Sequence, residues 1–190
     1  LGQVLTDSSV IFGLKTWQSP LDVMEATVQW CQRSGYRLLV KLHPKESKGK
    51  ATITDQPYNR LTYRKMQERP QLMNALRANQ ALVDKNNTFD TYALIDQSKI
   101  TVTINSQSGL EAALLGKPTV VCGDSFYRGF GFTLDVNCQE EFEIMMDYAK
   151  DFRVPYSADQ FAFIFYERYC RPKTVTALVS LIKEQVRKSR

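Results

Sequence analysis

The stretch Ile100–Gly123, ITVTINSQSGLEAALLGKPTVVCG, decides the fold of this chain. Its β-branched runs are typical of buried parallel strands, and its Leu- and Ala-rich middle is typical of a short helix. Gly116 ends that helix, and Lys117-Pro118 separates it from the next strand. The elements predicted here are a strand at Ile100–Ile104, a polar turn at Asn105–Gly109, a helix at Leu110–Leu115 and a strand at Thr119–Cys122.

The polar turn occupies the position where an open α/β sheet binds its ligands, at the carboxyl end of a strand. Backbone N–H groups at a helix N-terminus attract anions, and the hydroxyls of Ser106 and Ser108 add two donors. Helix capping alone would explain one such serine. Two serines together with Asn105 and Gly109 exceed what a cap needs, so we expect the turn, Gln107 included, to bind an anion such as a phosphate.

Outward from this stretch, strands and helices alternate along the chain, which predicts a parallel sheet with right-handed crossovers. The fold class is therefore α/β, a Rossmann-like parallel sheet with helices on both faces, followed by C-terminal helices. Ser19-Pro20 begins the first helix and Gly35 ends it. The further expected elements are strands at Gly2–Leu5, Tyr36–Leu42 and Ala81–Asp84, an insertion at 45–78 that Pro70 breaks, a helix at Thr91–Gln97, an edge strand at Phe132–Val136, and helices at Glu140–Lys150, from Ser157, and at Lys173–Lys188.

Two segments follow from this order: a Rossmann-like domain at 1–155 and C-terminal helices at 156–190.

The 190 residues carry a formal net charge of +5, which suits an anionic ligand or a negatively charged membrane surface. No apolar run approaches the roughly 20 residues of a membrane span, and no signal peptide is visible. The four cysteines form no CxxC pair, so we expect reduced thiols, no metal and a cytoplasmic location.

Further candidate residues follow the other strands at the same predicted edge. His43 is the only histidine in the sequence. Pro44 follows it, and because proline cannot continue a central strand, the chain leaves the sheet there. An imidazole here can donate to, or protonate, a leaving phosphate, and Lys41, which shares its strand face, is expected to bind the same phosphate. Asp7 and Ser8 follow the first strand. Glu111 lies in the first helical turn, where it either interacts with the helix dipole or accepts hydrogen bonds from ribose hydroxyls.

Two further functions are considered besides the binding of a nucleotide phosphate. The sequence has no GxGxxG motif, and Gly116–Thr119 lacks the spacing of a P-loop. A serine hydrolase that uses Ser106 or Ser108 with His43 is a second hypothesis, opposed by the absence of a GxSxG elbow and by the order His before Ser. A non-catalytic nucleotide-binding or interaction module is the third.

Several motifs, in order, resemble bacterial capsule polysaccharide biosynthesis proteins, which are Kdo-transferase-like glycosyltransferases. The residues that carry the resemblance are Gly2-Gln3-Val4, Asp7-Ser8, Leu39-Val40-Lys41-Leu42-His43-Pro44, Thr103-Ile104-Asn105-Ser106-Gln107-Ser108-Gly109-Leu110-Glu111-Ala112, Gly116-Lys117-Pro118 and Gly123. The resemblance covers residues 1–133.

The resemblance implies a GT-B architecture, with this chain as its C-terminal, nucleotide-sugar-binding half. It implies that His43, Ser106 and Ser108 hold the donor phosphate, with His43 as the catalytic group, and that Glu111 holds the ribose. The Ser-Gln-Ser sequence departs from the adjacent serines of related enzymes. The catalytic carboxylate of such enzymes belongs to an N-terminal domain that this sequence lacks, so the isolated chain is expected to be incomplete and inactive.

The same resemblance implies the partners. The donor is a nucleotide sugar, CMP-Kdo, and the acceptor is a polysaccharide or a glycolipid at the inner face of the cytoplasmic membrane. No separate cofactor, no metal and no nucleic acid is expected. The helices at 156–190 are expected to pack on the first domain or towards the missing one.

Overall fold

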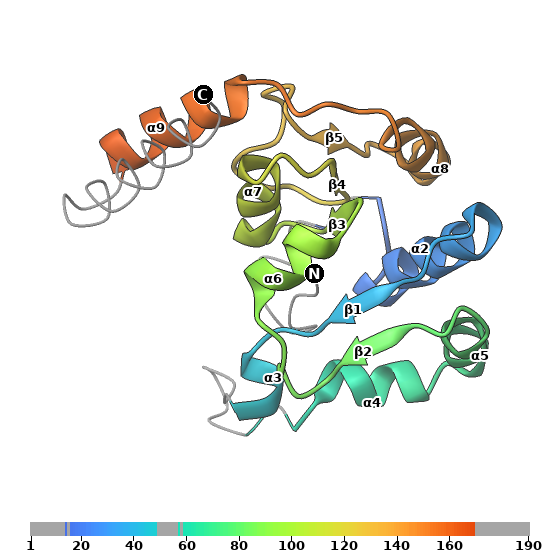
Figure 1. Cartoon of the computed structure of the whole chain (residues 1–190). Coiled ribbons are helices and arrows are strands. Elements are labelled where there is room, and N and C mark those ends of the chain that lie inside the picture. Colours follow the sequence, from blue (N-terminus) through green and yellow to red (C-terminus); the bar gives the residue numbers. More distant parts are fainter. Residues whose placement is uncertain (1–13, 15, 49–56, 58, 170–190) are drawn as a thin grey trace.

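The computed structural model describes residues 14, 16–48, 57 and 59–169 (Figure 1). Helices alternate with short parallel strands, which confirms the predicted α/β class. In chain order the elements are α2 (Pro20–Ser34), β1 (Leu39–Lys41), α3 (Lys45–Lys48), α4 (Leu61–Gln67), α5 (Pro70–Ala78), β2 (Leu82–Asp84), α6 (Thr91–Gln97), β3 (Thr101–Thr103), α7 (Gln107–Leu114), β4 (Thr119–Val121), β5 (Leu134–Asp135), α8 (Gln139–Tyr148) and α9 (Ser157–Tyr169).

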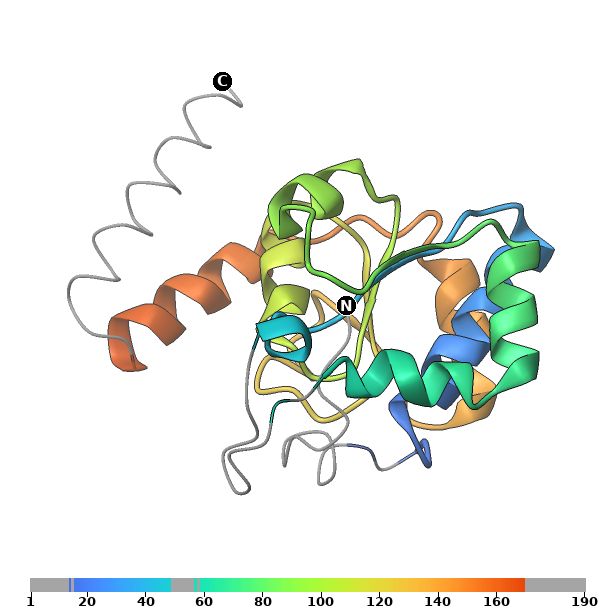
Figure 2. The same ribbon diagram turned by 90° about the horizontal axis from the view of Figure 1, so that it is seen from below.

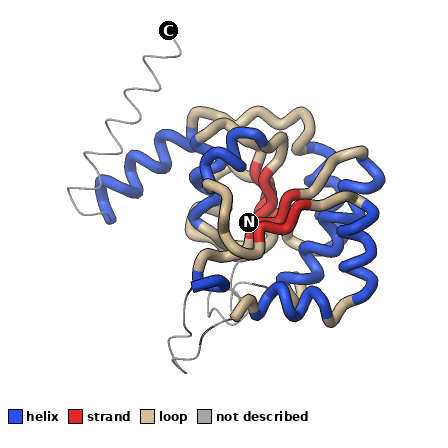
Figure 3. Tube along the Cα trace, turned by 60° about the horizontal axis from the view of Figure 1, so that its bottom comes forward, coloured by secondary structure: helices blue, strands red, loops and turns tan. Residues whose placement is uncertain are grey.

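The described strands form two parallel sheets where the sequence predicted one. β1 pairs with β2, and β3, β4 and β5 form the second sheet in that order. A cavity of about 550 Å³ is lined by residues of both β1 and β3. The strands lie in the middle of the molecule with helices around them (Figure 3). The predicted first strand at Gly2–Leu5 lies outside the described residues.

Helix α2 shows how local signals set an element's bounds. The Ser19 hydroxyl accepts a hydrogen bond from the Leu21 N–H at 3.2 Å, and Pro20 occupies the first helical position. Gly35 ends the helix in the left-handed conformation, at φ 71°. All three roles were predicted from the sequence. Helices α2, α5 and α8 lie on one side of the strands, and α6 and α7 lie on the other (Figures 1 and 2).

The predicted insertion at 45–78 contains α3, α4 and α5. Pro70 separates the last two helices as expected, because α4 ends at Gln67 and α5 begins at Pro70. The buried Glu46 joins the start of the insertion to α4: its carboxylate accepts hydrogen bonds from the Thr62 hydroxyl at 2.6 Å and the Thr62 N–H at 3.0 Å.

Three apolar clusters form the interior of the part of the chain that the structure describes. One contains Trp17, Trp30 and Phe142, and a second contains Val28, Met66 and Leu72. Helix α2 contributes to both, because Val23 and Trp30 face the first cluster while Leu21 and Val28 face the second. The third cluster joins α7, the segment after β4 and α9 around the buried rings of Tyr127 and Phe132.

The predicted helix at Leu110–Leu115 begins earlier than expected. Helix α7 starts at Gln107, so Gln107, Ser108 and Gly109 belong to its first turn and not to a loop. The edge strand near Phe132–Val136 and the helix near Glu140–Lys150 are confirmed as β5 and α8. Helix α9 projects from the body of the molecule (Figure 2). The helix predicted at Lys173–Lys188 lies outside the described residues, and the division at residue 155 stays a prediction.

Candidate functional site

The serine turn forms the N-terminus of α7. The Ser106 hydroxyl caps the helix by accepting a hydrogen bond from the Ser108 N–H at 3.3 Å. The two hydroxyl oxygens also lie 3.3 Å from each other. Ser106 and Ser108 therefore place two hydroxyls together beside the first-turn N–H groups of a helix, an arrangement that suits an anion.

Gly109 and Tyr127 hold this turn in place. The buried Tyr127 hydroxyl donates a hydrogen bond of 2.6 Å to the Ser106 carbonyl. A Cβ atom on residue 109 would lie 2.7 Å from a methyl carbon of Thr103 and still closer to the Tyr127 hydroxyl. Only glycine fits here, because the turn is pressed between β3 and the segment after β4. Tyr127 was not among the predicted site residues.

His43 follows β1 by two residues and is partly exposed. Its Nδ1 accepts a hydrogen bond from the Lys45 N–H at 3.1 Å. An accepting Nδ1 assigns the proton of the neutral imidazole to Nε2. In this tautomer Nε2 is the nitrogen that would donate to an anionic oxygen, and the phosphate-binding role of His43 stays a prediction.

Lys41 lies in a buried ion pair. Its Nζ is 3.0 Å from Asp84 Oδ2 and donates a second hydrogen bond of 2.7 Å to the Phe89 carbonyl. The sequence predicted an ammonium that faces the phosphate, whereas the structure engages it with the end of β2 and the segment that follows. Lys41 thus positions neighbouring backbone, and direct phosphate contact by Lys41 stays a prediction.

Glu111 and Gln107 lie one turn apart on α7. Gln107 is exposed, and its Nε2 donates to Glu111 Oε1 at 3.3 Å. Glu111 is partly exposed and lies on the same helix as Ser108, so it can reach groups next to an anion bound at the serines. Its ribose role stays a prediction. Asp7 and Ser8 lie outside the described residues.

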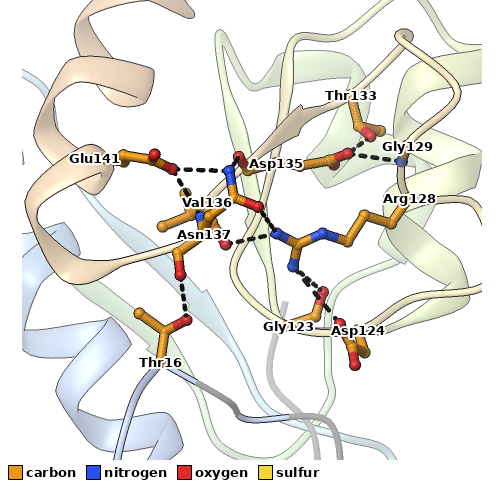
Figure 4. Close-up of polar contacts among 10 residues, drawn as sticks. All are labelled: Thr16, Gly123, Asp124, Arg128, Gly129, Thr133, Asp135, Val136, Asn137 and Glu141. Carbon is orange, nitrogen blue, oxygen red and sulfur yellow. Dashed lines mark hydrogen bonds and ion pairs between the residues drawn. The ribbon is translucent and has the colours of Figure 1, made fainter.

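A polar network closes the carboxyl ends of β4 and β5 (Figure 4). The guanidinium of Arg128 donates to the carbonyls of Gly123 at 3.2 Å and Val136 at 2.9 Å, and to Asn137 Oδ1 at 2.7 Å. Asp135 accepts a hydrogen bond from the Gly129 N–H at 2.7 Å. These contacts fix the segment between β4 and β5, which is rich in aromatic residues and glycine and which carries Tyr127. Arg128 and Asp135 were not among the predicted site residues.

The described residues offer no metal centre. They contain no group of three or more His, Cys, Asp or Glu side chains that could hold a metal ion. Burial raises the pKa of the Cys122 thiol to about 12, so this cysteine at the end of β4 is protonated and serves as a core residue. No helix within the described part of the chain is both long and apolar enough to span a bilayer.

The fold and the serine turn define an α/β protein with a helix N-terminus and two serine hydroxyls at the carboxyl end of a parallel strand. A model of the family described as capsule polysaccharide biosynthesis protein matches residues 1–169. The chain belongs to this family. Among curated proteins no significant match is found.

Two solved structures from Thermosulfurimonas dismutans are similar to this chain. One is KpsC, a beta Kdo 2,7 transferase, with 21% identity and a TM-score of 0.48, covering 72% of this chain and 36% of that one. The other is KpsC, a beta Kdo 2,4 transferase, with 26% identity and a TM-score of 0.49, covering 73% of this chain and 37% of that one. The matches thus span little more than a third of each solved chain.

Proposed function

We propose that this chain is the donor-binding half of a glycosyltransferase of capsule polysaccharide biosynthesis, with CMP-Kdo as the donor. The observation that carries the proposal is the α7 N-terminus, where Ser106 and Ser108 hold two hydroxyls 3.3 Å apart next to the helix N–H groups. Membership of the capsule polysaccharide biosynthesis family supports it. Sugar transfer from a nucleotide requires stabilisation of the charge on the departing phosphate. Hydroxyl and backbone N–H groups that donate hydrogen bonds provide this stabilisation without a metal.

The roles of the individual residues follow from their chemistry. Ser106 and Ser108 donate to the phosphate oxygens together with the first-turn N–H groups of α7. His43 donates a hydrogen bond from Nε2 to the same phosphate and stabilises the negative charge that develops on it as it leaves. Glu111 accepts hydrogen bonds from the ribose. The acceptor, a polysaccharide or glycolipid at the cytoplasmic face of the membrane, binds outside these residues.

Calorimetry with CMP, UDP and inorganic phosphate tests this proposal. We expect CMP to bind the folded chain more tightly than phosphate. The His43→Ala variant should lose roughly 10-fold in CMP affinity, because a hydrogen bond to a charged group is removed. Its midpoint of thermal unfolding should stay unchanged. A folded chain that binds no nucleotide would reject the donor site, and unchanged affinity in the variant would reject the role of His43.

A matched pair of serine variants locates the phosphate. The Ser108→Ala variant removes a hydroxyl from the α7 N-terminus and should weaken both CMP and phosphate. Ser98 ends α6 just before β3, at the opposite end of that strand, and its hydroxyl donates to the Ile95 carbonyl at 2.7 Å. The Ser98→Ala variant should bind both ligands like the unmodified chain. A serine-directed covalent probe that labels Ser106 or Ser108 would favour the hydrolase alternative instead.

A further inference from the structure

The buried pair of Lys41 and Asp84 is built around one segment, the residues that lead from β2 into α6. The side chains of Lys41 and Asp84 are only 4% and 1% exposed. Asp84 accepts hydrogen bonds from the Thr88 N–H at 2.8 Å and the Phe89 N–H at 3.2 Å, while Lys41 donates to the Phe89 carbonyl at 2.7 Å. Both backbone polar groups of Phe89 are therefore fixed by buried charges.

The aromatic side chains on this fixed segment nevertheless face solvent. Phe89 is 45% exposed, and Tyr92, in the first turn of α6, is 55% exposed. Asp90 between them caps α6 by accepting a hydrogen bond from the Ala93 N–H at 2.9 Å. A rigid backbone that presents exposed aromatic rings is the arrangement that a stacking platform requires, because little conformational entropy is lost on binding.

Both aromatic residues belong to segments that contact elements carrying the candidate phosphate and ribose groups. Phe89 is tied to Lys41, which precedes His43 by two residues. Helix α6 contacts α7, and Tyr92 on α6 lies against Glu111 on α7. Burial raises the pKa of the Tyr92 hydroxyl, and the negative charge of the nearby Glu111 carboxylate raises it further. The serines and Glu111 on α7 and the ring of Tyr92 on α6 therefore belong to two helices in contact.

We propose that Phe89 and Tyr92 form the platform on which the pyrimidine base of the bound nucleotide stacks. This inference rests on the proposed function and adds the base subsite to it. Stacking explains why a buried ion pair, whose two charges must be removed from water, holds the backbone of an exposed loop. Because every base has a π face, the platform provides affinity, whereas discrimination between bases requires other groups.

Calorimetry with CMP and with ribose 5-phosphate, which lacks the base, tests the platform. The Phe89→Ala variant should bind CMP roughly 5- to 150-fold more weakly, the range measured when a stacking aromatic is truncated. Its affinity for ribose 5-phosphate should not change. The matched control is Phe163→Ala, because Phe163 on α9 is 47% exposed and lies on another element. This control should bind both ligands normally.

Each remaining outcome is decisive. Equal weakening of both ligands in Phe89→Ala, or unchanged CMP affinity, would overturn the platform while leaving the donor site intact. If the unmodified chain binds neither ligand, the proposed function fails and the platform fails with it. Should Phe89→Ala unfold, Phe89→Leu retains apolar bulk without a π face, and nuclear magnetic resonance gives the readout. The base protons of CMP should shift upfield on binding to the unmodified chain and shift less on binding to Phe89→Leu, in which Tyr92 is the remaining ring.

Discussion

At the scale of single residues, Gly109 is the most constrained position of the serine turn. It is buried between the Tyr127 hydroxyl and a methyl group of Thr103. Its missing side chain is what allows Tyr127 to reach the Ser106 carbonyl. The geometry of the two serine hydroxyls therefore depends on a residue that has no side chain.

Replacement of Gly109 by alanine should destabilise the fold. The added Cβ forces Tyr127 or Thr103 to move, and overpacking of this kind costs about 1–3 kcal/mol in the free energy of unfolding. Urea unfolding followed by circular dichroism measures the loss. In the double variant Gly109→Ala, Tyr127→Phe the cost should be less than the sum of the single costs, because the clashing hydroxyl is gone. Strict additivity would show that Tyr127 and Gly109 do not interact in this way.

At the scale of elements, the Lys41–Asp84 pair joins β1, β2 and the start of α6. Burial acts to raise the pKa of Asp84, but hydrogen bonds from the Thr88 N–H, the Lys41 ammonium and the Phe89 N–H outweigh it and hold this pKa below its ordinary value. In the folded chain Asp84 therefore stays ionised where the unfolded chain already binds a proton. Its contribution to stability is present at neutral pH and is lost as the pH falls through the acidic range.

The Asp84→Asn variant should reveal this contribution. Removing one partner leaves the Lys41 ammonium buried without its counter-charge, which costs about 3–5 kcal/mol at neutral pH. The free energy of unfolding should also fall less steeply between about pH 5 and pH 3 than in the unmodified chain. Urea titrations at a series of pH values test both effects. If the two chains lose stability in parallel on acidification, the lowered pKa of Asp84 does not contribute.

Local signals in the sequence predicted the elements, and contacts between distant residues escaped prediction. Ser19, Pro20 and Gly35 set the bounds of α2 through caps that act within a few residues. Helix α7 begins three residues before its predicted start because Ser106, and not the polar character of Gln107–Gly109, decides where the helix begins. The pairing of Lys41 with Asp84 joins residues 43 positions apart, and no periodicity of the chain encodes it. Ser106 and His43 were predicted because they follow strands. Tyr127 contacts the serine turn from another segment, which Arg128 holds in place, and neither of these two residues was predicted.

At the scale of the whole molecule, the two sheets are joined through α2. The cluster around Phe142 packs with the sheet of β3, β4 and β5, and the cluster around Leu72 packs with the sheet of β1 and β2. Helix α2 is buried in both, and its Trp30 also donates a hydrogen bond of 3.2 Å to Asp147 on α8. Because α2 packs into both clusters, the two sheets and the clusters that pack with them should unfold together.

The two tryptophans allow this coupling to be measured, because Trp17 and Trp30 both belong to the cluster around Phe142. Leu72 is fully buried in the other cluster, so Leu72→Ala should cost about 2–5 kcal/mol through lost apolar contact and a cavity. In urea unfolding, we expect this variant to move the tryptophan fluorescence midpoint and the circular dichroism midpoint by the same amount. If fluorescence keeps its original midpoint while part of the circular dichroism signal is lost earlier, the halves unfold separately. Coupling would mean that the segments after β1 and β2, which carry His43 and Phe89, are held in register with the serine turn after β3 by one cooperative core.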